Sequence, residues 1–256
     1  MADNRRLGML LVLTGAALAV WSFGDREADQ RHEVSERISV VELGSRDGDV
    51  TIKVSDDPDT TIQEKRSFWM FKRGDGYQVD GETLRLTGDC GWNCKSDYVV
   101  TVPRGTKVTG QAASGDIVLE GVGGVDAKTQ SGDVTITDVT GAVTLDTNSG
   151  KVELDNVKGA LDIDVKSGDI KAERLSGGAV KAKTTSGDIE LELAEANSVT
   201  ATGVSGDIDI TVPKGSYQVD TDATSGDVDN DLGSTADATH RVDARTTSGN
   251  ISIGSR

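Results

Sequence analysis

Residues 180–191 read VKAKTTSGDIEL, and residues 199–210 read VTATGVSGDIDI. In both stretches apolar and polar residues alternate on either side of a Ser-Gly-Asp triplet. A period of two places alternate side chains on one face of a β-strand. Glycine and aspartate interrupt strands and favour turns. Each stretch therefore predicts two short strands that meet at a corner.

The triplet recurs along the chain at nearly constant spacing. Its serine, in complete or variant copies, is Ser114, Ser131, Ser149, Ser167, Ser186, Ser205, Ser225 or Ser248. Successive serines are 17, 18, 18, 19, 19, 20 and 23 residues apart. Two short strands and two corners fill such a unit, and stacked units bury a continuous thin core. The sequence predicts an all-β chain, a single-stranded β-solenoid with two short strands per coil over residues 110–256. A β-sandwich of hairpins is the alternative.

The triplets are the candidate structural turns. The six complete copies are Ser114, Gly115, Asp116, Ser131, Gly132, Asp133, Ser167, Gly168, Asp169, Ser186, Gly187, Asp188, Ser205, Gly206, Asp207, Ser225, Gly226 and Asp227. Glycine permits the positive φ of a tight corner, and Ser and Asp side chains bond nearby backbone N–H groups and close the turn. The second corner often holds glycine, at Gly124, Gly141, Gly159 and Gly178.

The N-terminal residues predict export. Residues 1–6 form a short tail with Arg5 and Arg6, and an uncharged run of 17 residues follows at 7–23. This run predicts one transmembrane helix with its N-terminus in the cytoplasm and the body of the chain extracytoplasmic. Cleavage as a signal peptide, followed by secretion, is the alternative. Residues 24–37 are charged and are expected to form a linker.

Residues 38–109 predict an N-terminal β region that caps the stack. Strand-like alternation continues there, and the aromatic segment 67–73 is the candidate cap. Its alternative is a contact with a partner or a membrane. Cys90 and Cys94 are the two cysteines of the chain. Outside the membrane a disulfide is their expected state, because the compartment is oxidising.

These features together resemble a known bacterial family. The anchor, the Cys90–Cys94 loop, the phrase YVVTVPRG at 98–105 and the Ser-Gly-Asp series are similar to the family named "putative adhesin", a membrane-anchored β-strand repeat family of unknown function. The resemblance covers residues 38–256. It implies a β-solenoid at the bacterial cell envelope, with some members linked to envelope-stress responses. It supplies no catalytic residue.

Charge and composition narrow the function. A net charge of −16 argues against nucleic acid as a partner, because phosphate binding needs a basic surface. Glycan-cleaving enzymes need a groove with clustered acid–base groups and usually aromatic platforms. Residues 110–256 contain one aromatic residue, Tyr217, and no irregular loop rich in His, Arg or Lys. We expect a non-catalytic cell-envelope surface protein, an adhesion or interaction scaffold for an unidentified envelope component or protein partner.

Two alternatives remain open from the sequence. No cofactor is required, but stacked carboxylates at Asp116, Asp133, Asp169, Asp188, Asp207 and Asp227 could bind calcium. Lys151 and Asn250 interrupt that series. Self-assembly is the other alternative, because the chain stops at 251–256 directly after a predicted strand, and an open last coil could pair with another chain.

Overall fold

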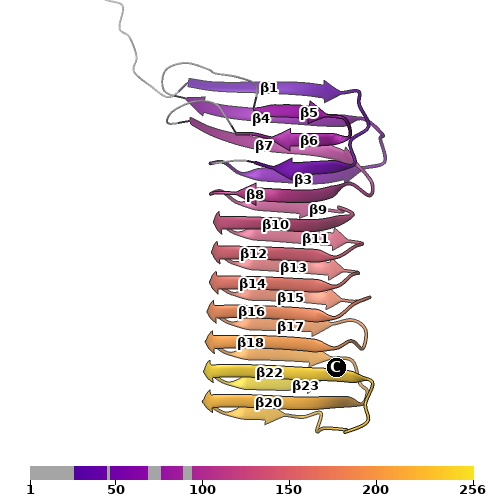
Figure 1. Ribbon diagram of the computed structural model, residues 1–256, viewed down its shortest axis with the longest axis vertical. Coiled ribbons are helices and arrows are strands. Elements are labelled where there is room, and N and C mark those ends of the chain that lie inside the picture. The colour runs from indigo at the N-terminus through magenta and orange to yellow at the C-terminus, as the bar shows by residue number, and fades with distance from the viewer. Residues whose placement is uncertain (1–25, 45–46, 69–75, 89–93) are drawn as a thin grey trace, which may run out of the picture.

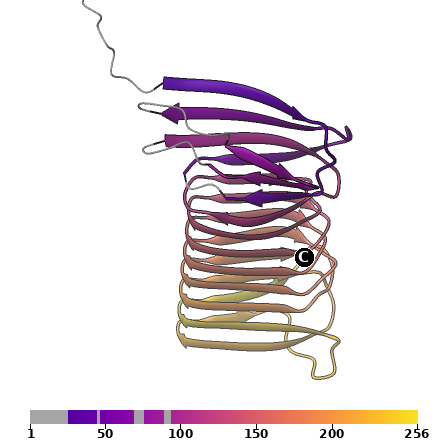
Figure 2. The ribbon, with the colours of Figure 1, turned by 45° about the horizontal axis from the view of Figure 1, so that its top comes forward.

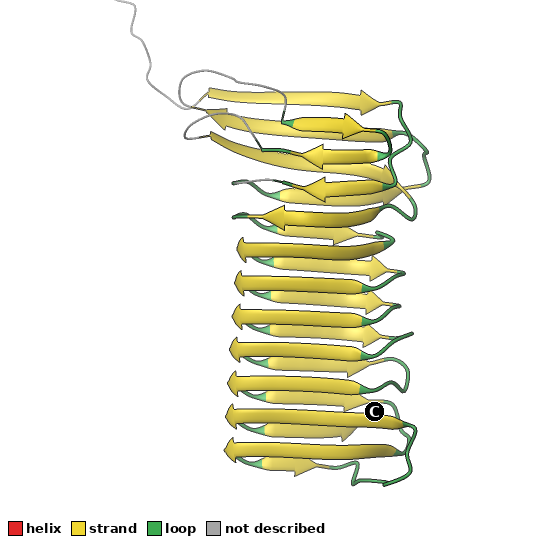
Figure 3. Ribbon diagram, in the orientation of Figure 1, coloured by secondary structure: helices red, strands yellow, loops and turns green. Residues whose placement is uncertain are grey.

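The structure, a computed structural model, describes residues 26–44, 47–68, 76–88 and 94–256. In these residues the chain forms 23 β-strands, which belong to a 12-stranded and an 11-stranded sheet (Figure 3). None of the described residues belongs to a helix that is long and apolar enough to cross a membrane. The predicted anchor, residues 7–23, lies outside the described residues.

The first sheet has the order β1-β4-β7-β3-β9-β11-β13-β15-β17-β19-β23-β21. Its strands are β1 (Arg26–Val34), β4 (Thr60–Phe68), β7 (Cys94–Pro103), β3 (Val50–Ser55), β9 (Ile117–Glu120), β11 (Val134–Val139), β13 (Val152–Val157), β15 (Ile170–Leu175), β17 (Ile189–Leu193), β19 (Ile208–Val212), β23 (Ile251–Ser255) and β21 (Val228–Asn230).

The second sheet has the order β20-β22-β18-β16-β14-β12-β10-β8-β2-β6-β5. Its strands are β20 (Tyr217–Ser225), β22 (His240–Ser248), β18 (Val199–Ser205), β16 (Val180–Ser186), β14 (Leu161–Ser167), β12 (Val143–Ser149), β10 (Gly124–Ser131), β8 (Lys107–Ala112), β2 (Val40–Leu43), β6 (Thr83–Leu86) and β5 (Tyr77–Asp80).

The two sheets form a solenoid-like stack of coils. Each coil of the repeat contributes one strand to either sheet, so the sheets lie face to face along the stack (Figure 1). Neighbouring coils pair in parallel and in register, as Val134 with Val152 in the first sheet and Val143 with Leu161 in the second. Hairpins would give antiparallel neighbours, so the β-sandwich alternative is wrong for the repeat. Apolar side chains of the two inner faces, mostly Val, Ile, Leu and Ala, form the buried core.

The stack does not follow chain order at its C-terminal end. Strands β22 and β23 lie between the β18–β19 coil and the β20–β21 coil. The last strand of the chain is therefore interior, and the expectation that 251–256 forms an open last coil is wrong. Each coil presents the same apolar columns to both neighbours, so the alternation alone does not fix which coil lies next to which. The connection 231–239 carries the chain back past β20.

The N-terminal end is rearranged in a similar way. Strand β2 pairs with β8, and β3 pairs with β9. In the sequence, 51 residues separate the end of β3 at Ser55 from the start of β8 at Lys107, and these residues contain the strands β4 to β7. Beyond them β1, β4 and β7 pair antiparallel, and β5 and β6 form an antiparallel hairpin (Figure 2).

The expected linker 24–37 contributes an edge strand, β1, to this cap. An edge strand tolerates charged residues because one of its sides faces water. Two inward contacts hold it: Val34 is buried, and the His32 ring lies 5.0 Å from the ring of Tyr77.

Candidate functional site

All the predicted Ser-Gly-Asp corners lie along one edge of the stack, here called the triplet edge. The triplet glycines have positive φ, for example 116° at Gly132 and 143° at Gly168. A Cβ at Gly132 would lie 2.1 Å from the carbonyl oxygen of Gly115, and one at Gly168 would lie 2.0 Å from that of Gly150. Glycine is required there for two reasons, the backbone conformation and the close approach of successive coils.

The triplet aspartates tie one coil to the next. The backbone N–H of Asp133 donates to Oδ1 of Asp116 at 2.9 Å, and the N–H of Asp207 donates to Oδ1 of Asp188 at 2.8 Å. The sequence predicts that each of these carboxylates accepts a backbone hydrogen bond within its own turn. The structure corrects this assignment, because the acceptor serves the neighbouring coil.

We call this series of hydrogen bonds from one triplet to the next the aspartate ladder. Two variants of the triplet differ in whether they continue it. Asn250 continues it, because its side-chain Oδ1 accepts the N–H of Asp227 at 3.0 Å. Lys151 donates its own N–H to Asp133, but its ammonium group has no lone pair to offer the N–H of Asp169. The ladder is therefore broken at one coil.

The aspartate ladder gives calcium no evident ligand set. Its carboxylates lie one per coil and accept backbone hydrogen bonds along the stack. Within the described ranges, no group of three or more His, Cys, Asp or Glu side chains is placed to hold a metal ion.

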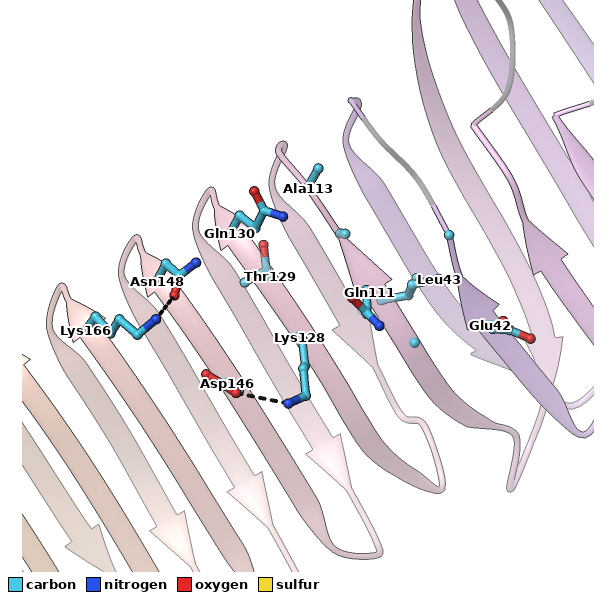
Figure 4. Close-up of a pocket in the computed structure, with 13 residues that line it drawn as sticks. Glu42, Leu43, Gln111, Ala113, Lys128, Thr129, Gln130, Asp146, Asn148 and Lys166 are labelled. Carbon is cyan, nitrogen blue, oxygen red and sulfur yellow. Dashed lines mark hydrogen bonds and ion pairs between the residues drawn. The ribbon is translucent and has the colours of Figure 1, made fainter.

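A groove crosses the outer face of the second sheet near the N-terminal end of the repeat, and we call it the Gly110 groove. It has a volume of about 520 Å³ and lies over β2, β8, β10, β12 and β14 (Figure 4). Its polar lining residues are Glu42, Gln111, Lys128, Thr129, Gln130, Asp146, Asn148 and Lys166.

Gly110 of β8 lines the groove, where it pairs with Leu43 of β2 and Ala127 of β10. The position is tight on one side, where a Cβ at Gly110 would lie 2.3 Å from the carbonyl oxygen of Leu43. A glycine inside a strand marks a close backbone approach. The glycine is visible in the sequence, but by itself it does not predict a groove.

The groove offers mixed hydrogen-bonding groups. Lys128 Nζ lies 3.2 Å from Asp146 Oδ2, and Lys166 Nζ donates to Asn148 Oδ1 at 2.5 Å (Figure 4). The Lys128 and Asp146 side chains are 64% and 47% exposed, so both are solvated charges. Such groups suit reversible contact with a polar partner surface and resemble the rim of an interface.

The second corner has a feature that the sequence did not indicate. Asp138, Asn156 and Arg174 have φ of 58°, 55° and 52°, a left-handed conformation uncommon for side-chain-bearing residues. Asn156 Nδ2 donates to Asp138 Oδ1 at 2.6 Å. None of the four predicted glycines has positive φ in this structure. Glycine is needed there for space, since a Cβ at Gly159 would lie 2.3 Å from the Gly141 carbonyl oxygen.

A buried polar cluster lies in the N-terminal cap. Arg66 Nε is 2.6 Å from Glu64 Oε1, and both side chains are almost fully buried. The Tyr98 hydroxyl donates to the Gly76 carbonyl oxygen at 2.7 Å. Burial, and then the negative charge of Glu64, raise the pKa of Tyr98. The cluster joins β4 and β7 to the residue that precedes the β5–β6 hairpin.

Two predicted features lie outside what the structure describes. Cys90 is among the residues not described, so the Cys90–Cys94 disulfide remains a prediction. Most of the aromatic segment 67–73 is likewise outside the described residues, so its capping role also remains a prediction.

Comparison with solved structures gives a match with a TM-score above 0.5. A putative adhesin from Bacteroides fragilis matches with a TM-score of 0.53 and 17% identity, over 91% of this chain and 99% of that chain. A putative adhesin from Parabacteroides distasonis matches with a TM-score of 0.44 and 12% identity, over 91% and 98%. A putative lipid binding protein from the same species has a TM-score of 0.41 and 12% identity, over 89% and 96%.

Comparison with sequences gives the family. No curated protein matches this chain. The family model described as Toastrack DUF4097 matches residues 38–254, a span that includes the coils, the triplet edge and the Gly110 groove. The chain belongs to the Toastrack DUF4097 family.

Proposed function

We propose that this protein is a non-catalytic interaction scaffold of the cell envelope and that the Gly110 groove is its docking site. The observation that carries the proposal is the groove itself, a polar hollow of about 520 Å³ over five strands of the second sheet. A repeat stack presents long, rigid surfaces suited to partner binding. The groove interrupts such a surface at one defined place.

The chemistry of the groove favours binding over catalysis. Asp146 is paired with Lys128, and both charges are open to water. General acid–base catalysis needs a group positioned in a site from which water is largely excluded. The Lys128 and Asp146 side chains, 64% and 47% exposed, are not in such a site. The partner we propose is a polar protein surface or an envelope polymer that exchanges hydrogen bonds with Gln111, Gln130 and Asn148.

The proposed location rests on the sequence. The run 7–23 would hold the chain in the membrane, with the stack outside the cytoplasm. A rigid stack attached at its N-terminal end would then present the groove close to the membrane, because the groove lies near that end of the repeat (Figure 1). One structural relative is named a putative adhesin, which directs the search toward surface partners.

Site-specific crosslinking in the source cells tests the proposal. A photoreactive amino acid replaces the exposed Gln130 in the groove of the full chain, and in a control chain it replaces the exposed Glu190 on the first sheet. We expect a discrete crosslinked species from position 130 that position 190 does not give. Equal patterns from both positions, or no species from position 130, would contradict the docking site.

A further inference from the structure

At the C-terminal end of the stack, Tyr217 of the last coil is buried, but the inner positions that follow it are only partly covered. Val219 and Ala223 are partly exposed, whereas Val199 and Val242 at the column of Val219 are buried. Val228, at the end of the first sheet, is 44% exposed. β20 and β21 end the two sheets, and the core is only partly covered there, by side chains that include Leu232. β20 is the last labelled strand at this end in Figure 1.

The free edge of β20 is covered over only half its length. The N–H of Thr235 donates to the Tyr217 carbonyl at 2.8 Å. Ser234 Oγ accepts the N–H of Val219 at 2.9 Å and donates to its carbonyl at 3.1 Å. In a strand, alternate residues direct their N–H and C=O groups to the same side. Thr221 and Ala223 therefore direct theirs to this same side, where no strand of the described residues lies.

Elsewhere in the stack, a strand with two outward aspartates is followed by a strand with two lysines. In β14, Asp162 and Asp164 point outward. The next coil places Lys181 over Asp162, with Nζ 3.8 Å from Oδ2, and Lys183 over Asp164, with Nζ 2.8 Å from Oδ2. β16 lies parallel to β14 and in register with it. An Asp-x-Asp strand is thus followed by a Lys-x-Lys strand.

Asp220 and Asp222 of β20 occupy the same two columns, by the register that runs from β16 through β18 and β22 to β20. Asp220 Oδ2 already lies 2.8 Å from Arg241 and 3.3 Å from Arg245, both on the neighbouring strand β22. Asp222 is exposed and has no ion pair among the described residues. The last rung therefore repeats the outward pattern of β14 without the lysines that follow it there.

We propose that the free edge of β20 accepts an extended basic strand from a partner protein as one further parallel rung. The partner strand would alternate lysine or arginine, over Asp220 and Asp222, with small or β-branched residues over Val219 and Ala223. Backbone hydrogen bonds to Thr221 and Ala223 would provide affinity, and the two charge columns would provide selectivity. The surface is separate from the Gly110 groove, so the proposal extends the proposed function.

A second copy of this chain is a poorer occupant. Two C-terminal ends meeting would oppose Asp222 and Asp229 with the same acidic residues, and like charges on facing strands are destabilising. In a second copy, strand β16, which carries Lys181 and Lys183, is already paired on both sides within its own stack. A basic strand supplied by a different protein matches both the hydrogen bonds and the charge.

A peptide taken from this chain tests the inference. The probe is residues 180–186, VKAKTTS, end-blocked and fluorescently labelled, and its control has both lysines replaced by glutamate. Binding to the full chain, purified in detergent, is followed by fluorescence anisotropy at low and at physiological salt. We expect saturable binding of the lysine peptide that weakens with salt, and binding of the glutamate peptide that is at least roughly tenfold weaker.

Two variants distinguish binding at the free edge of β20 from non-specific attraction of a basic peptide to an acidic protein. Asp222→Lys reverses the charge of an exposed side chain, and Thr221→Pro removes an N–H on the open side, where proline is tolerated in edge strands. Each should abolish saturable binding without altering the circular dichroism spectrum. Equal binding by Asp222→Lys, equal binding of the two peptides, or a dimer in light scattering that Asp222→Lys leaves intact would overturn the proposal.

Discussion

The backbone N–H of Asp188 donates a hydrogen bond to Oδ1 of Asp169, 2.9 Å away in the preceding coil. This relationship recurs along the triplet edge, and it gives each aspartate a structural role that a turn within one coil would not require. The same edge requires glycine, because coils approach there through their backbones. The triplet thus encodes the contact between coils as well as the corner within one coil.

Asp188→Ala should lower the free energy of unfolding by about 1 kcal/mol, because the N–H of Asp207 loses its acceptor at a partly solvated site. Asp188→Asn keeps a side-chain oxygen, as Asn250 does naturally, and should cost less than half as much. Denaturant unfolding of both variants measures the difference. Equal losses would show that the hydrogen bond does not matter and that charge does.

Lys151→Asn should stabilise the chain by about 0.5–1 kcal/mol, because it supplies the acceptor that the N–H of Asp169 lacks. Lys151→Ala removes the same ammonium group without adding an acceptor, so it is the matched control. We expect the unfolding midpoint to rise for the asparagine variant only. A rise in both would instead indicate relief of lysine packing, and a rise in neither would contradict the ladder.

Gly168→Ala should cost roughly 3 kcal/mol or more, because its Cβ would lie 2.0 Å from the Gly150 carbonyl oxygen at a φ of 143°. Gly254→Ala is the control, since no atom outside its chain neighbours lies within 4 Å of its Cβ position. Thermal melts of the two variants provide the comparison. Similar small shifts for both would rule out the close stacking of the triplet edge.

The stability of the cap should fall in alkali through Tyr98. The folded state raises the pKa of this phenol above its usual value of 10.0, chiefly by burial. The unfolded chain then releases the proton first, so stability is full below pH 10 and declines as the pH rises above it.

Tyr98→Phe removes this titration and should flatten the dependence of unfolding free energy on pH above 10 relative to the native chain. Near pH 7 it should cost about 1 kcal/mol for the lost hydrogen bond to Gly76. Lysine titrations are common to both proteins and cancel in the difference. Parallel profiles for the two proteins would show that Tyr98 does not contribute.

Much of the repeat could be predicted from the sequence. The pairs Ile189 and Leu191, and Val180 and Ala182, alternate with polar residues, and all four side chains are buried. Period and spacing predict strands and corners because side-chain direction follows the backbone locally. The all-β stack and the family resemblance were available before the structure.

The order of the coils could not be predicted in the same way. β23 pairs with both β19 and β21, yet each of these neighbours satisfies the same apolar columns. The left-handed corner at Arg174 was also hidden, because arginine carries no signal for positive φ. The Gly110 groove could be predicted only in part, since Gly110 is visible as a glycine inside a predicted strand while most of the polar groups around it come from four other strands.

The docking site is tested most directly by filling the groove. Ala113 lines the Gly110 groove (Figure 4), and Ala113→Phe would occupy part of it. The measurement is the yield of the crosslinked species from position 130 in cells that express the Ala113→Phe chain. We predict that this species disappears while the thermal melt of the purified chain is unchanged. An undiminished yield from a chain with an unchanged melt would contradict binding in the groove.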